Sequence, residues 1–158
     1  PWKLRYELDG PGWANCRFEI DGQRAAMTAS YLTDALDDLC RAALGMLSGE
    51  PSAEAVFAEE PGEYRWLFDR VGATRMRVRV INGVNTAKNP TDSVILDAQC
   101  ETNLFAKALL SELRRLLTLH GEEGYRAEWV RFPFPRDKLK SLSELLEPHS
   151  NSGAPPGV

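Results

Sequence analysis

Apolar and polar residues alternate with a period of two on both sides of Val71-Gly72, within the stretch 63–82. Such alternation around a glycine-containing turn predicts a β-hairpin with one buried face. The apolar positions of that face are Tyr64, Trp66 and Phe68 before the turn, and Met76, Val78 and Val80 after it.

The same alternation occurs in the first thirty residues, at 2–8, 14–20 and 25–27. Asp9-Gly10-Pro11-Gly12 and Asp21-Gly22 separate these stretches and are typical turn sequences. We therefore predict an antiparallel three-stranded meander at the start of the chain. Further strands are expected at 53–60 and from Val94 to Cys100.

Helical spacing predicts two long helices and a short one. The first should be capped by Ser30, and the second should run from Thr102 or Asn103 to a left-handed stop at Gly121. The short helix is expected at 138–147. The apolar stripe of the first helix comprises Leu32, Ala35, Leu36, Leu39, Cys40, Ala43 and Leu47.

The stretch 122–135 is harder to assign, because Pro133 and Pro135 exclude a central strand or helix. We expect it to cross the body of the domain. Its aromatic residues can be anchors in the core or in an interface, and we favour the core. They are Tyr125, Trp129, Phe132 and Phe134.

Strands in runs, rather than alternating with helices, predict the α+β class. We expect a single domain over 1–147. It should contain an antiparallel sheet of six to seven strands, with the two long helices on one face and the short C-terminal helix beside them. The stretch 82–91 is expected to be a polar, mobile loop, and 148–158 a disordered tail.

The chain has 158 residues and a formal net charge of −4, which argues against general nucleic-acid binding. No apolar run reaches the roughly 18 residues of a membrane helix, and the first residues lack the apolar core of a secretory signal. Cys16, Cys40 and Cys100 are expected to be reduced thiols in the core. We therefore expect a cytoplasmic protein.

Candidate catalytic chemistry is sparse. His120 and His149 are the only histidines, and neither has neighbours at metal-ligand spacing. His120 is expected to serve the carbonyl end of its helix. No phosphate-binding loop, nucleophile elbow or zinc-protease motif occurs, so no catalytic, metal or cofactor site is predicted. A carboxylate pair assembled by the fold is an open alternative.

Two charged sets are candidate binding residues. The arginine set could bind anions, or it could be a solvated face balanced by Glu63, Asp69 and Asp97, which we favour. The acidic set could attract a basic protein, or it could simply be solvated. The arginine set comprises Arg65, Arg75, Arg77 and Arg79, with Arg70 beside it, and the acidic set comprises Asp34, Asp37, Asp38, Glu54, Glu59 and Glu60.

Two further segments carry a family resemblance. Pro61-Gly62-Glu63-Tyr64-Arg65-Trp66, and His120-Gly121 followed by Tyr125, Trp129 and Phe132-Pro133-Phe134-Pro135, resemble features of small uncharacterised bacterial α+β proteins. Some of these are encoded beside polymorphic or contact-dependent toxins and act as immunity proteins. The resemblance implies no functional residue.

From the residues and the resemblance together, we predict a non-enzymatic cytosolic protein-binding domain of the immunity type. It would occlude the active surface of a toxin, and a basic toxin domain is the expected partner. The alternative is a sensor or accessory domain that binds a small ligand between sheet and helices. An enzyme with dispersed carboxylates is a third hypothesis.

Overall fold

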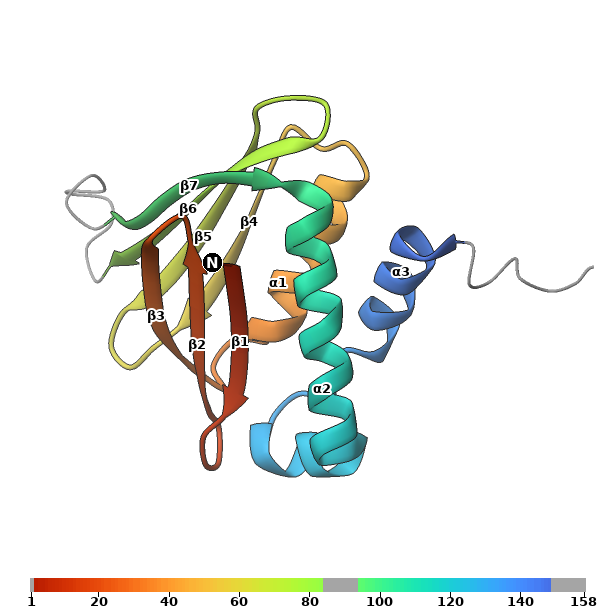
Figure 1. The fold of residues 1–158 in the computed structure, drawn as a ribbon. Helices are drawn as coiled ribbons and strands as arrows, with labels where there is room; N and C mark the ends of the chain where they lie inside the picture. Colours follow the sequence, from red (N-terminus) through yellow and green to blue (C-terminus); the bar gives the residue numbers. More distant parts are fainter. Residues whose placement is uncertain (1, 84–93, 149–158) are drawn as a thin grey trace, which may run out of the picture.

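The computed structural model describes residues 2–83 and 94–148. It confirms the α+β class, with seven strands and three helices in the described residues (Figure 1). The loop predicted at 82–91 starts too early, because Asn82 and Gly83 are strand residues that pair with Tyr64 and Glu63. The rest of that loop and the tail after Pro148 lie outside the described residues. The elements are β1 (Trp2–Leu8), β2 (Trp13–Ile20), β3 (Gln23–Ser30), α1 (Ala35–Leu47), β4 (Ser52–Ala58), β5 (Glu63–Arg70), β6 (Arg75–Gly83), β7 (Val94–Glu101), α2 (Thr102–Trp129) and α3 (Arg136–Leu146).

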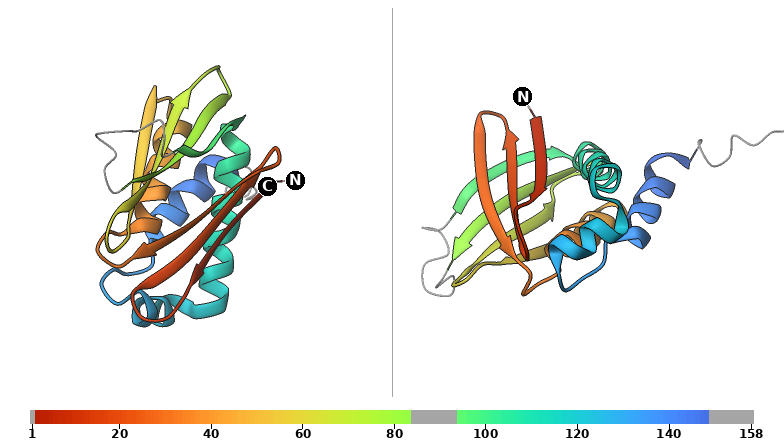
Figure 2. Two further views of the ribbon diagram at one scale, coloured as in Figure 1. Left: turned by 90° about the vertical axis from the view of Figure 1, so that its left-hand side faces the viewer. Right: turned by 90° about the horizontal axis from the view of Figure 1, so that it is seen from below.

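The strands form two antiparallel sheets rather than one. The predicted meander is a three-stranded sheet in the order β1-β2-β3, and the other sheet has the order β4-β5-β6-β7. The predicted hairpin is confirmed as β5 and β6, in which Trp66 lies opposite Val80 and Phe68 lies opposite Val78. The two sheets cross one another (Figures 1 and 2).

The core lies between the sheets and is closed by the helices. Phe18 of β2 contacts Trp66 of β5 and Phe105 of α2, with ring centroids 5.6 Å apart in each pair. Trp66 and Phe105 are themselves 5.9 Å apart, and all three side chains are fully buried. Because large aromatic side chains contribute most of the apolar area in a core, this contact joins both sheets to α2.

The helices cover the open side of this sandwich. In Figure 1, α1 runs beside β4, α2 runs beside β1, and α3 packs on α1 and α2. All three cysteines are free and buried, as predicted. Burial raises the pKa of the Cys16 thiol and, to about 11, that of Cys100.

The predicted start of the first helix was wrong. Ser30 is the last residue of β3, where it lies opposite Trp13, so the strand continues through the expected cap. The Ser30 hydroxyl accepts a hydrogen bond from the Leu32 N–H at 3.4 Å. Helix α1 begins only at Ala35, and Leu32, which we placed on its apolar stripe, is 46% exposed.

The prediction for 122–135 was also wrong in part. Gly121 has a φ of 68° and interrupts α2, but the chain then continues as helix to Trp129. Pro133 and Pro135 both follow Trp129, so they do not prevent the helix from continuing to that residue. Tyr125, Trp129 and Phe134 are buried, which confirms a core role for these three aromatics. Among the described residues, no helix is long and apolar enough to span a membrane.

Candidate functional site

The arginines of β6 lie on the outer face of the four-stranded sheet, each beside an acid on a neighbouring strand. Arg77 donates to Asp97 at 2.6 and 2.8 Å, and Arg79 donates to Asp69 at 2.8 Å. Arg75 donates to Glu101 at 3.0 Å. The hydrogen bond from Arg77 lowers the pKa of Asp97. The cross-strand pairs predicted for Asp69 and Asp97 are therefore present.

The two arginines of β5 are also engaged. Arg65 pairs with Glu54 at 2.5 Å and with Glu63 on its own strand. Arg70 donates to main-chain carbonyl groups, including that of Met46 at 2.8 Å. An anion on this face would have to compete with carboxylates already held by the fold. The positive charge seen along the sequence is thus balanced in space.

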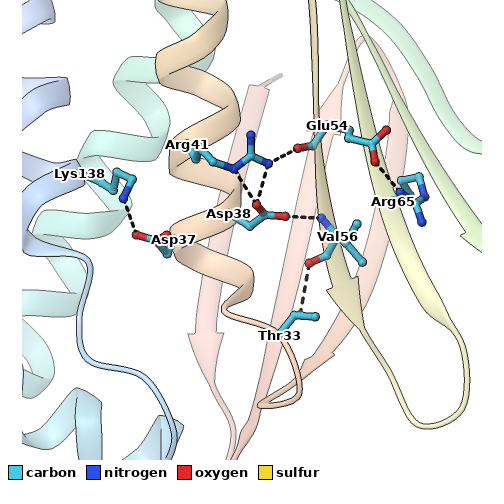
Figure 3. Close-up of polar contacts among 8 residues, drawn as sticks. All are labelled: Thr33, Asp37, Asp38, Arg41, Glu54, Val56, Arg65 and Lys138. Atoms are coloured by element: carbon cyan, nitrogen blue, oxygen red, sulfur yellow. Dashed lines mark hydrogen bonds and ion pairs between the residues drawn. The ribbon is translucent and has the colours of Figure 1, made fainter.

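Three members of the acidic set have partners inside the fold (Figure 3). Asp37 pairs with Lys138 of α3 at 3.0 Å. Asp38 pairs with Arg41 at 2.6 Å and also accepts a hydrogen bond from the main-chain N–H of Val56 at 2.8 Å. Glu54, as described above, pairs with an arginine of β5. These carboxylates hold α1, β4, β5 and α3 together.

Asp34 immediately precedes α1 and points inward. One of its carboxylate oxygens, Oδ1, is buried without a hydrogen-bond partner. Burial, and after it the charge of Asp37, raises the pKa of Asp34 to about 6. The hydroxyl groups of Tyr6 and Tyr125 are buried without partners as well, and burial raises the pKa of both tyrosines.

Glu59 and Glu60 occupy the turn between β4 and β5. Glu59 accepts a hydrogen bond from the Thr28 hydroxyl, and Glu60 is exposed. Within 2–83 and 94–148, neither carboxylate forms an ion pair. Within the acidic set, only Glu59 and Glu60 therefore have both an accessible position and a charge that no ion pair of the described residues neutralises. Asp37, Asp38 and Glu54 are paired, and Asp34 points inward.

Sequence reasoning missed a second role of polar residues, which is to close the sheet edges. At β1, Tyr6 donates its N–H to Glu112 at 2.8 Å and accepts from Arg115 at 2.8 Å. At β7, the Gln23 side chain bonds both the N–H and the C=O of Asp97, at 3.0 and 2.7 Å. Such caps occupy groups that could otherwise pair with another chain.

The edge of β4 is closed in the same way from α1 and the segment before it. Besides the bond to Asp38, Val56 accepts a hydrogen bond from the Thr33 hydroxyl at 3.3 Å. The Thr33 oxygen also accepts from the Ala58 N–H at 3.1 Å, and Arg41 donates to the Glu54 carbonyl at 2.6 Å. These side-chain hydrogen bonds to edge strands cannot be predicted from residue types alone, because the two partners of each bond lie far apart in the sequence.

One groove lies between the three-stranded sheet and α2, where the small-ligand hypothesis expects its site. Its volume is about 310 Å³, and its lining includes Arg115 and His120 of α2, with Glu7 of β1 and Asp9 of the turn that follows. In the described part of the chain, no three His, Cys, Asp or Glu side chains are grouped to hold a metal ion. Asp34, with its raised pKa, does not line this groove.

No protein-family profile matches the sequence, and no protein of curated function matches it. One chain of a solved structure described as "CdiA-CT/CdiI toxin and immunity complex from Enterobacter cloacae" has a similar shape, with a TM-score of 0.45 and 10% sequence identity. The match covers 72% of this chain and 99% of that chain. A likeness of this size establishes neither a common fold nor a common function.

Proposed function

We propose that this protein is a non-enzymatic, cytoplasmic protein-binding domain of the immunity type, which occludes the active surface of a basic toxin domain. The observation that carries the proposal is the contrast between the two charged sets. The arginines of the outer sheet face are compensated, whereas Glu59 and Glu60 stand at a turn without an ion-pair partner among the described residues.

Uncompensated charge at a surface attracts a partner of opposite sign and raises the rate of association. The β4–β5 turn is well placed for this purpose, because its two strands are paired along their whole length from Ser52–Asp69 to Ala58–Glu63. A partner would therefore meet acidic groups on a rigid support. The resemblance of 61–66 and 120–135 favours the immunity type within the wider class of binding domains.

The test is direct binding to the purified product of the neighbouring gene, measured by isothermal titration calorimetry. We expect a one-to-one complex and loss of the partner's toxicity when the two proteins are expressed together. Lack of any heat of binding at micromolar concentrations, with no protection in cells, would overturn the proposal. A complex without protection would support binding but reject the immunity role.

A second candidate function is small-ligand binding in the groove between the three-stranded sheet and α2. A ligand present at 100 times its dissociation constant would stabilise the fold by about 2.7 kcal/mol. A thermal-shift screen of polar metabolites tests this, with His120→Ala as the groove variant. A hit whose shift is unchanged by this variant would exclude the groove as its site.

A further inference from the structure

The β3–α1 connection and the end of α2 lie near the lower end of the molecule in Figure 1, and together these segments carry three exposed apolar side chains. Tyr31 and Leu32 belong to the β3–α1 connection and are 36% and 46% exposed, and Val130 follows α2 and is 50% exposed. Single exposed apolar residues are common, but a group of them on one surface marks a site of interaction.

Main-chain hydrogen bonds at Gly12 join the two segments that carry these residues. The Gly12 N–H donates to the Glu128 carbonyl at 2.7 Å, and the Tyr31 N–H donates to the Gly12 carbonyl at 2.8 Å. The Tyr31 ring also packs on Gly12, since a Cβ atom there would lie 2.9 Å from Tyr31 Cδ1. The β1–β2 turn thus joins the β3–α1 connection to the end of α2.

The backbone at Val130 is strained. Its φ of 80° and ψ of −54°, with the Arg131 N–H donating to the Trp129 carbonyl at 3.0 Å, form a γ-turn of the rare positive-φ type. A β-branched residue in this region is a conformational outlier, and such strain gathers at binding sites. The turn directs the chain away from the helix and leaves the valine exposed.

Thr33 connects this apolar group to the acidic turn. The Ala58 N–H donates to the Thr33 hydroxyl oxygen at 3.1 Å, so Leu32 and Glu59 flank a hydrogen-bonded pair. Next to Val130, the Arg131 guanidinium lies over the Phe132 ring, 5.8 Å from its centroid. This contact leaves the charge of the exposed Arg131 in place beside Val130, whereas the charges next to Leu32, across the Thr33–Ala58 pair, are the acidic ones of Glu59 and Glu60.

We propose that Tyr31, Leu32 and Val130, here named the end patch, form the docking surface of the protein, with Glu59 and Glu60 as its charged rim. This inference rests on the proposed function and deepens it. The occupant is a basic protein domain that inserts into contact with the apolar residues and places lysines or arginines against the rim. An apolar centre beside a charged rim is the usual arrangement of a binding hot spot. A second copy of this chain is disfavoured, because its own net charge of −4 opposes self-association.

The centre and the rim predict different kinetic effects. Loss of a central apolar contact accelerates dissociation, whereas loss of rim charge slows association and weakens its salt dependence. The experiment is biolayer interferometry of the intact chain against the purified product of the neighbouring gene. We expect Leu32→Ser to raise the dissociation rate about tenfold or more, with little change in the association rate. The double variant E59K/E60K should slow association about tenfold at low salt.

Matched controls lie away from the end patch. Leu104 is 52% exposed near the start of α2, and Glu144 is exposed on α3 without an ion-pair partner in the part of the chain that the structure describes. Leu104→Ser and Glu144→Lys should leave both rates unchanged. All variants should keep the wild-type melting temperature, since the altered side chains are exposed or make one polar contact.

The outcomes separate the two proposals. If the wild-type chain forms no complex, the proposed function fails, and the end patch fails with it. If the complex forms but the end-patch variants behave like the controls, only the end patch is overturned. A wild-type dimer that Leu32→Ser abolishes would assign the surface to a second copy and would also overturn the inference.

Discussion

Glu112 should be among the most sensitive polar positions in the fold. Its carboxylate is 7% exposed and accepts from the Tyr6 N–H at 2.8 Å and from Arg115 at 2.9 and 3.0 Å. Truncation to alanine leaves a buried N–H without an acceptor, which costs about 1–3 kcal/mol. Breaking a buried pair costs about 3–5 kcal/mol in all, but Arg115 is 28% exposed and can be rehydrated.

We therefore expect Glu112→Ala to lower the free energy of unfolding by about 3 kcal/mol. Glu112→Gln keeps an oxygen for the Tyr6 N–H and should lower it by about 1–2 kcal/mol. Urea denaturation followed by circular dichroism measures both. With a slope of about 2 kcal/mol per molar urea, the alanine variant should shift the midpoint by about 1.5 M.

The matched control is Glu101→Ala, which removes an exposed pair with Arg75 in which the side chains are 40% and 48% exposed. Surface pairs contribute about 1 kcal/mol or less. A double-mutant cycle of Glu112 and Arg115 separates their coupling from the loss of the backbone cap. If Glu112→Ala were no more destabilising than the control, the view that Glu112 closes the β1 edge would be refuted.

Three further predictions concern single positions. Burial raises the pKa of Asp34 to about 6, so the folded state retains a proton that the unfolded state releases between about pH 4 and 6. Ionisation should therefore reduce stability as the pH rises through this window, by about 1 kcal/mol after allowance for solvent screening. Urea titrations measure the free energy of unfolding of Asp34→Asn relative to the wild type, which should be higher at pH 7 than at pH 4. A relative free energy that is higher at pH 4 would contradict this sign. Gly12→Ala should destabilise the fold by about 1–2 kcal/mol more than Gly10→Ala. The two glycines have φ values of 78° and 76°, but only Gly12 has a ring packed on it. Equal thermal stabilities of the two variants would exclude the clash. Gln23→Ala should lower the free energy of unfolding by about 1 kcal/mol and speed the exchange of the Asp97 amide proton. If NMR showed unchanged exchange at Asp97, the hydrogen bonds from Gln23 would not be needed to protect this edge.

Much of the fold could be predicted, because the alternation of apolar and polar residues along a strand shows directly which side chains are buried. The hairpin of 63–82 is such a case, since Trp66 and Phe68 face the core as expected. Helix boundaries were harder to predict. The strand ending at Ser30 continues because it pairs with β2, and that pairing is invisible in local sequence. The helix beyond Gly121 was not predicted, although Pro133 and Pro135 disfavour helix only near their own positions and α2 already ends at Trp129.

The candidate site was predictable only in its ingredients. Arg77 and Asp97 are twenty residues apart, so net charge along a segment did not show that they neutralise each other. The same holds for Asp37 and Lys138, which are separated by 101 residues. Leu32 has the spacing of the apolar positions of the first helix, but α1 begins only at Ala35, so Leu32 lies before the helix and is exposed.

The cap on β1 also has a consequence during protein synthesis. Tyr6 and Glu112 are 106 residues apart, so the N-terminal meander leaves the ribosome well before the helix that closes its edge. Over that interval the first strand presents free N–H and C=O groups to other nascent chains. Chains that end before α2 should therefore associate through this edge, whereas complete chains should not.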